Sequence, residues 1–235
     1  MLAAVNRMMP GSSPGMATMT RIVCISDTHD QHEEVKIPEA DLLIVAGDFT
    51  CHRFPILQNY IRFNEWLGKQ PVKHKVVVAG NHDTLFQQQY GAGKSILTNA
   101  NYLEDEGIEL EGLKIWGSPW TPLFGDWAFM KPDKLLKPYW DAIPNDTDIL
   151  VTHGGPFGTL DRTGNYYGSK SCGSESLAER LKKLKLKLHV FGHIHESFGQ
   201  QGTSVNAAQC DEMNDFVNQP IVVDIENPLV DRLSS

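Results

Sequence analysis

The chain has 235 residues, of which 41% are hydrophobic and 21% are charged, which is the usual composition of a folded globular protein. Its net charge of −8 argues against an extended surface for nucleic acid but is compatible with a small nucleotide. No apolar run reaches the roughly 20 residues that a membrane-spanning helix needs, so we expect no membrane partner.

Residues 1–20 are rich in Met, Gly, Ser, Pro and Ala and lack the continuous apolar region of a signal peptide. We expect a disordered leader over residues 1–20 and one folded domain over residues 21–235. The four cysteines show no Cys-x-x-Cys spacing, which predicts reduced thiols and a cytoplasmic location.

Five short apolar runs predict buried strands, and a residue type that binds metal ions follows each run. The runs cover residues 22–26, 42–47, 76–80, 149–152 and 188–192. The residues that follow them are Asp27 and His29, then Asp48, Asn81, His153, and finally His193 and His195. Because the carboxyl ends of neighbouring strands lie at one edge of a sheet, we expect these side chains to meet.

Other segments complete a predicted α/β fold. The spacing of apolar residues predicts helices, and the Glu111-Gly112 pair predicts a hairpin. Helices are expected at residues 54–67, 132–140 and 174–187, the last capped by Ser174, with hairpin strands at 108–110 and 113–116 and late strands at 204–206 and 221–225. The alternation of strand, helix and hairpin units favours two stacked sheets with helices outside.

Four of the predicted ligands are imidazoles, which indicates a transition metal rather than Mg or Ca. In Asp27-x-His29 and in His193-x-His195 the spacing of two is the period of a strand. Both side chains of each pair can therefore point toward the same ion.

Asp48 follows a glycine, and its two carboxylate oxygens can hold two ions at once, so we predict that it bridges them. Asn81 adds a neutral amide oxygen, which leaves the ions electrophilic. Two divalent ions carry four positive charges, and the carboxylates of Asp27 and Asp48 neutralise two of them. The surplus suits a bridging hydroxide and one anionic phosphate, which is the pattern of two-metal hydrolysis.

His82 is predicted to act on the substrate rather than on a metal ion. It is adjacent to Asn81, and neighbours in an extended segment point in opposite directions. An imidazole titrates near neutral pH, so His82 can protonate a leaving oxygen or bind a phosphoryl oxygen, and Asp83 is near enough in sequence to orient it. A purely structural histidine is the alternative interpretation.

Together these motifs resemble the full set of the calcineurin-like metallophosphoesterases. They are Asp27-Thr28-His29, Gly47-Asp48, Gly80-Asn81-His82-Asp83, His153-Gly154-Gly155 and Gly192-His193-Ile194-His195. Residues 64–68, 116–120 and 189–192 make the chain most similar to the small metallophosphoesterase-domain-containing proteins related to class III cyclic-nucleotide phosphodiesterases. The resemblance covers residues 21–228.

The resemblance implies a four-layer αββα sandwich of two mixed β-sheets flanked by helices. It places one metal ion on Asp27, His29, Asp48 and His195, a second on Asp48, Asn81, His153 and His193, and His82 beside the scissile phosphate. The expected cofactor is a pair of divalent transition-metal ions, Mn²⁺ first, with Fe or Zn as alternatives. Some relatives carry Gly at the position of His193 and are expected to be less active, whereas the ligand set is complete here.

Three functions fit these expectations. The first is an enzyme that hydrolyses a phosphodiester, foremost in a small cyclic nucleotide, by attack of a metal-bridging hydroxide. The second keeps this chemistry but acts on phosphomonoesters, phosphoproteins or nucleic-acid ends. The third is a metal-binding scaffold protein with little turnover. The expected partner is a small phosphoester or nucleotide, and the sequence identifies no protein partner.

Several other residues keep two interpretations. The Gly-rich segment 154–173 is either a substrate-facing rim or a long loop packed on its own side chains. Its candidate contacts are Phe157, Arg162, Tyr166 and Tyr167. The basic run 180–187 is interpreted as a solvated helix face rather than a membrane or nucleic-acid patch. The remaining histidines are assigned to surface or core: His32, His52, His74 and His189. His52 is the candidate exception, because it lies close to Asp48 in the sequence.

Overall fold

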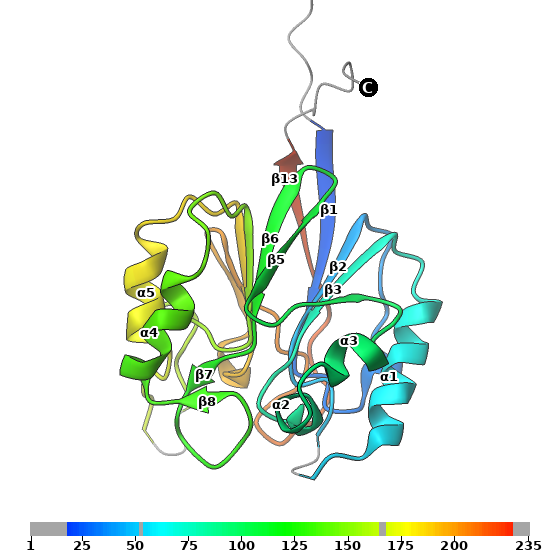
Figure 1. The fold of residues 1–235 in the computed structure, drawn as a ribbon, viewed down its shortest axis with the longest axis horizontal. Helices are drawn as coiled ribbons and strands as arrows, with labels where there is room; N and C mark the ends of the chain where they lie inside the picture. Colours follow the sequence, from blue (N-terminus) through cyan, green and yellow to red (C-terminus); the bar gives the residue numbers. More distant parts are fainter. Residues whose placement is uncertain (1–17, 52–53, 165–167, 228–235) are drawn as a thin grey trace, which may run out of the picture.

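The computed structural model describes residues 18–51, 54–164 and 168–227. Two β-sheets stack face to face, with α1 (Leu57–Lys69) outside one sheet and α4 (Asp133–Asp141) and α5 (Glu175–Leu181) outside the other (Figure 1). This is the predicted four-layer αββα sandwich. The first strand begins at Thr18, inside the range predicted as leader, and residues 1–17 lie outside the described part of the chain.

The first sheet has five strands in the order β13-β1-β2-β3-β4. Strands β1 to β4 run parallel, and β13 pairs antiparallel with β1. Their bounds are β1 Thr18–Ile25, β2 Leu42–Ala46, β3 His74–Val78, β4 Asn101–Tyr102 and β13 Ile221–Asn227. Helix α1 joins β2 to the parallel β3, which is the predicted crossover.

The second sheet has six strands in the order β11-β12-β10-β9-β6-β5. Strands β5 and β6 form the predicted hairpin, with Leu110 opposite Leu113, and β6, β9, β10 and β12 run parallel. The bounds are β5 Glu106–Leu110, β6 Leu113–Ser118, β9 Ile149–Thr152, β10 Leu188–Phe191, β11 Gly199–Gln201 and β12 Ser204–Asn206.

Short elements surround one end of the two sheets. A two-stranded sheet joins β7 to β8 in parallel, and the loop between them covers residues 123–129. The short elements are β7 Thr121–Pro122, β8 Met130–Lys131, α2 Thr84–Gln88, α3 Ala92–Ile96 and the 3-10 helices η1 His32–Glu34 and η3 His195–Ser197. None of them has the length from which a periodic pattern can be recognised.

Side chains of each central strand alternate between two buried clusters rather than between core and solvent. In β1, Ile22 and Cys24 belong to the cluster between the sheets, whereas Val23 and Ile25 pack toward the outer helices. Burying one such side chain stabilises the fold by about 1.5–3 kcal/mol. The central strands are therefore packed on both faces, which fixes the points at which the loops leave their carboxyl ends.

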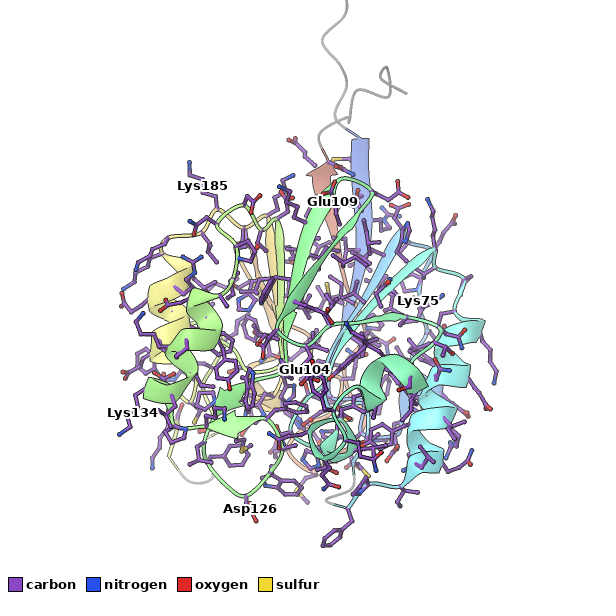
Figure 2. All side chains as sticks on the ribbon, viewed as in Figure 1. Lys75, Glu104, Glu109, Asp126, Lys134 and Lys185 are labelled. Carbon is purple, nitrogen blue, oxygen red and sulfur yellow. The ribbon has the colours of Figure 1, made fainter. Side chains whose placement is uncertain are left out.

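Helix α5 is shorter than predicted, because it ends at Leu181 rather than Lys187. The amides of Lys183 and Leu184 donate to carbonyls three residues earlier, and such tight bonds close the last turn. Leu184 packs against the core while Lys185 is exposed and points outward (Figure 2), which agrees with a solvated face. Among the described residues, no helix has both the length and the apolar character needed to cross a bilayer.

Ser174 caps α5 as predicted, and we expect Ser174→Ala to lower the free energy of unfolding by about 2 kcal/mol. Its hydroxyl accepts from Leu177 N at 3.0 Å and from the Nε1 of the fully buried Trp140 at 3.1 Å, so the substitution leaves both donors without an acceptor. Urea denaturation measures the change. The exposed Ser95→Ala is the control and should shift stability by less than about 0.5 kcal/mol. Equal effects of the two substitutions would contradict this role of Ser174.

Candidate metal centre

Each predicted ligand lies just beyond the carboxyl end of a strand, and the two sheets bring these ends together. Asp27 follows β1, Asp48 follows β2, His153 follows β9 and His193 follows β10. Most of the side chains are buried: Asp27 0%, His29 4%, Asp48 2%, Asn81 2% and His153 0% exposed. The predicted convergence is therefore present in the fold.

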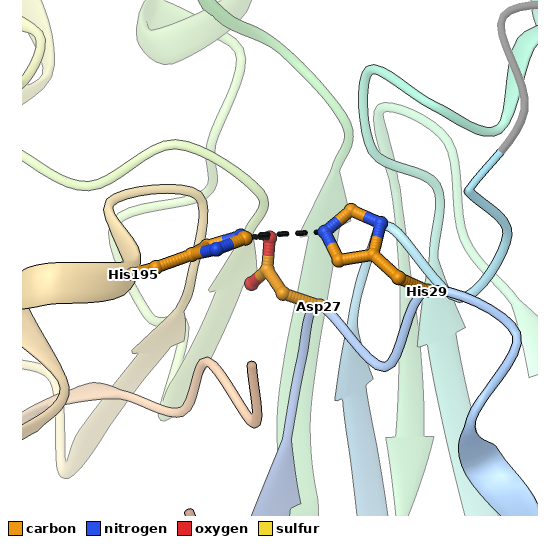
Figure 3. A group of neighbouring side chains, drawn as sticks. All are labelled: Asp27, His29 and His195. Carbon is orange, nitrogen blue, oxygen red and sulfur yellow. Dashed lines mark hydrogen bonds and ion pairs between the residues drawn. The ribbon is translucent and has the colours of Figure 1, made fainter. Parts of the chain in front are cut away.

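Within the described part of the chain, ligand atoms gather in three groups, and the atoms of each group lie no more than 4.8 Å apart. The groups are Asp27 with His29 and His195, His29 with Asp48 and His82, and Asp48 with His153 and His193. Figure 3 shows the rings of His29 and His195 pointing toward one another beside the Asp27 carboxylate. Asp48 and His29 each belong to two groups, and of the two only the Asp48 carboxylate has two oxygens with which it could bridge two ions.

Backbone carbonyls orient four of the histidines at the site. A carbonyl oxygen only accepts hydrogen bonds, so the Nδ1 atom that contacts it carries the hydrogen and leaves the Nε2 lone pair free. The pairs are His153 with Ala46 at 2.9 Å, His195 with Asp211 at 2.7 Å, His29 with Thr50 at 3.3 Å and His82 with Cys51 at 3.1 Å. The tautomer that binds metals is thus favoured at each ring.

The donor set fits transition-metal ions. The Nε2 atoms of His29 and His195 face each other across 3.3 Å. The Nε2 of His153 lies 2.9 Å from Asn81 Oδ1 and 3.3 Å from Asp48 Oδ2. Acceptor atoms this close need either a proton or a metal ion between them, and imidazole with carboxylate is a set that transition metals accept.

Asp48 and His153 shift each other's pKa values in opposite directions. Burial opposes ionisation of Asp48, but the adjoining His153 ring outweighs it and holds the pKa of Asp48 far below its usual range. Burial likewise disfavours a charged His153, yet Asp48 raises the pKa of that imidazole to about 9. A metal ion at this position would compete with a proton for the same donor atoms.

The backbone is strained where it presents the ligands. Asp27, Asp48 and His193 have φ of 51°, 50° and 70°, in the left-handed region that residues with a side chain seldom adopt. Gly47 has φ of 97°, and a Cβ there would lie 2.6 Å from His153 Nδ1. Only glycine allows β2 to end this close to His153.

Asp83 does not orient His82, which corrects the prediction from sequence. Its carboxylate is fully buried and accepts from the backbone amides of Gly80 at 2.7 Å, Asp48 at 2.8 Å and Thr50 at 3.1 Å. Adjacent residues project in different directions at this turn, so Asp83 reaches across to the loop after β2. It fixes the backbone of Asp48, while the Cys51 carbonyl orients His82.

The loop between β7 and β8 adds two aromatic contacts that the sequence did not indicate. The Trp127 ring lies 4.4 Å from the His82 ring, and the Phe124 ring lies 5.2 Å from that of His193. The amide of Ala128 donates to the Asn81 carbonyl at 3.2 Å, which ties this loop to the one that carries His82. A short loop with isolated aromatic residues has no motif from which this position could be predicted.

Other candidates from the sequence lie elsewhere. Phe157 borders a separate cavity between α4 and α5. His32 and His189 are buried in the interior, and His74 contacts Glu111 at 3.0 Å, as expected for core and surface positions. His52, Tyr166 and Tyr167 fall outside the described residues.

Known proteins resemble this chain along most of its length. The model of the calcineurin-like phosphoesterase family matches residues 20–197. Metallophosphoesterase domain-containing protein 1 of Homo sapiens is 38% identical, covering 93% of this chain and 75% of the relative. A UPF0046 protein of Caenorhabditis elegans is 37% identical, and the match covers 86% of this chain and 74% of that protein. A solved Staphylococcus aureus structure, described as a candidate 5′-nucleotidase, has a TM-score of 0.49 at 13% identity and covers 89% of this chain and 54% of that one.

The matched range contains all seven predicted ligands and His82. Relatives more than 30% identical in sequence cover most of the chain as well. The chain therefore belongs to the calcineurin-like phosphoesterase family and is a metal-dependent phosphoesterase.

Proposed function

We propose that the protein hydrolyses phosphodiester bonds of small nucleotides, foremost cyclic ones, with two divalent ions, Mn²⁺ being the expected metal. Two sets of ligands hold them: Asp27, His29, Asp48 and His195 on one ion, and Asp48, Asn81, His153 and His193 on the other. The convergence of these donor atoms from separate strands carries the proposal. We also propose a cytoplasmic location, which the four free thiols support.

When bound, the two ions activate water and neutralise charge on the phosphoryl oxygens. The chain itself positions the donor of the leaving-group proton. His82 donates from Nδ1 to the Cys51 carbonyl, and its backbone amide donates to Asp48 Oδ1 at 2.7 Å. Nε2 then faces the substrate, and in the imidazolium form, which carries hydrogen on both ring nitrogens, it can give its proton to the leaving oxygen while Nδ1 keeps its bond to Cys51.

The test uses chelator-treated protein that is reloaded with Mn²⁺. We expect it to hydrolyse bis(p-nitrophenyl) phosphate with a higher kcat/KM than p-nitrophenyl phosphate. His193→Ala should lower diester turnover by about 100-fold or more, because one ion loses an imidazole ligand. The matched control is His74→Ala, at the opposite end of β3 from the site, which should leave turnover unchanged.

The other outcomes separate the alternatives. Faster turnover of the monoester would replace the proposal with a phosphomonoesterase. Binding of two ions without cleavage of either ester or of a cyclic nucleotide would instead favour a scaffold role. Retention of full diester activity in His193→Ala would refute the assigned ligand set.

A further inference from the structure

The loop between β7 and β8, residues 123–129, is fixed against the metal centre (Figure 1). At its base the amide of Thr121 donates to the carbonyl of Phe129 at 3.0 Å. A Cβ at Gly154, directly after His153, would lie only 2.6 Å from the hydroxyl of Thr121. The base of the loop therefore packs tightly against the turn that follows a predicted metal ligand.

Phe124 stays largely uncovered although its loop is held in place. The residue is 66% exposed, whereas Phe129 of the same loop is 1% exposed. A single exposed ring is ordinary on a protein surface, but this one borders the metal centre. Its centroid lies 5.2 Å from that of the His193 ring, with 44° between the two planes. The exposed part of the ring is a surface on which a flat group of a bound substrate can stack.

His82 and Phe124 adjoin different parts of the metal centre. The His82 ring lies 4.9 Å from the ring of His29, and atoms of these two residues fall in one group of candidate ligands. Phe124 contacts His193 instead, whose ring lies 4.9 Å from that of His153. His193 and His153 share another group of candidate ligands. A leaving oxygen that meets His82 is therefore not the part of the substrate that meets Phe124.

A phosphodiester carries two organic groups, of which one leaves and the other is retained on phosphorus. The four oxygens around phosphorus point to the corners of a tetrahedron, so the retained group extends in a different direction from the leaving group. When the leaving oxygen lies at His82, the retained group is the one that can contact Phe124. A phosphomonoester has no retained organic group and cannot make this contact.

We propose that Phe124 is a specificity-determining residue whose ring stacks on a flat organic group retained on phosphorus. The contact favours diesters with an aromatic retained group over alkyl diesters and over monoesters. Stacking on one aromatic side chain changes binding by about tenfold or more. The inference rests on the proposed phosphodiesterase function, because it takes the leaving oxygen to lie at His82.

The test uses two open diesters that share p-nitrophenolate as the leaving group, because both ester oxygens of a cyclic nucleotide belong to one sugar. Phenyl p-nitrophenyl phosphate retains an aromatic group, and methyl p-nitrophenyl phosphate retains an alkyl group. Turnover of each is measured with the Mn²⁺-loaded full chain. In Phe124→Ala we expect the ratio of kcat/KM for the phenyl ester to kcat/KM for the methyl ester to fall about tenfold from the wild-type ratio. The ratio removes any effect of the substitution on His193, since that effect is common to both esters.

Two further variants are the controls. Phe124→Tyr keeps the aromatic ring and should hold the ratio within about twofold of the wild type. Tyr90→Ala removes a 95% exposed aromatic side chain outside this loop and should leave the ratio unchanged. An unchanged ratio in Phe124→Ala would overturn the proposal. An equal loss for both esters would overturn it too, because Phe124 would then act only through His193.

A binding measurement separates this inference from the hydrolytic function. Phenylphosphonate and methylphosphonate carry their organic group on a P–C bond that hydrolysis does not cleave, and calorimetry gives their Kd values for the Mn²⁺-loaded protein. We expect the wild type to bind phenylphosphonate about tenfold more tightly than methylphosphonate, and Phe124→Ala to lose this preference. Such a preference in a protein that cleaves no ester would support the contact with Phe124 and refute the proposed function. Absence of the preference in the wild type would overturn the contact whatever the turnover.

Discussion

Asp48→Asn is expected to lower kcat/KM for a phosphodiester by at least about 10³-fold and to reduce the bound metal from two ions to one. Both oxygens of Asp48 are engaged: Oδ1 accepts from the His82 amide at 2.7 Å, and Oδ2 lies 3.3 Å from His153 Nε2. An asparagine has one oxygen and one NH₂ group. In one orientation the NH₂ faces the His82 amide, and in the other it faces the ligand cluster, so one of the two functions is lost.

Metal analysis of the purified variant and its turnover of bis(p-nitrophenyl) phosphate measure the two effects. Asp224→Asn is the control, because this carboxylate is exposed and contacts Arg21 at 2.9 Å. It should bind two ions and remain fully active. Two ions and activity within about tenfold of the wild type in Asp48→Asn would show that Asp48 is not shared between the metals.

Much of the fold can be predicted from the local sequence, because a strand that is buried on both faces has a continuous run of apolar residues. The runs before Asp27, Asp48 and His153 are all strands in the structure. Boundaries of helices were less well predicted where a local restriction competes with periodicity. Helix α1 begins at Leu57 rather than Phe54. Phe54 precedes a proline, and that position disfavours helical backbone.

The orientation of the histidine rings depends on backbone carbonyl oxygens, which the sequence does not identify. The Nδ1 atoms of His153 and His195 donate to the carbonyls of Ala46 and Asp211, and any residue type offers a carbonyl. Only the folded backbone places such an oxygen behind the ring. The residues that can bind metal could therefore be predicted from sequence, whereas the groups that orient them could not.

Contacts between distant loops were also beyond prediction. Trp127 reaches His82 because the amide of Ala128 is bonded to the Asn81 carbonyl, and no spacing in the sequence encodes that pairing. The sequence places Asp83 beside His82, but the carboxylate of Asp83 accepts from the amides of Asp48 and Thr50, which are 35 and 33 positions away. Closeness in sequence is a poor guide where a tight turn sends successive side chains in different directions.

The second large effect is expected for Asp83→Ala, which should lower the free energy of unfolding by about 3 kcal/mol. The substitution leaves the buried amides of Gly80, Asp48 and Thr50 without an acceptor. Burial and the charge of Asp48 raise the pKa of Asp83 well above its usual value, so the native carboxylate also has an unfavourable electrostatic energy. Its removal offsets part of the loss, which is why we expect less than the sum of three unsatisfied donors.

Urea denaturation of the metal-free protein measures this change, and diester turnover per folded molecule measures its effect on the site. Asp133→Ala is the matched control, because Asp133 accepts from Ser174 and Ser176 between α4 and α5, in the helix layer on the far side of the second sheet (Figure 1). Both variants should be less stable, but only Asp83→Ala should also lose turnover, by about tenfold or more, since the backbone of Asp48 is no longer fixed. Equal turnover per folded molecule in the two variants would show that Asp83 stabilises the fold without positioning the metal ligands.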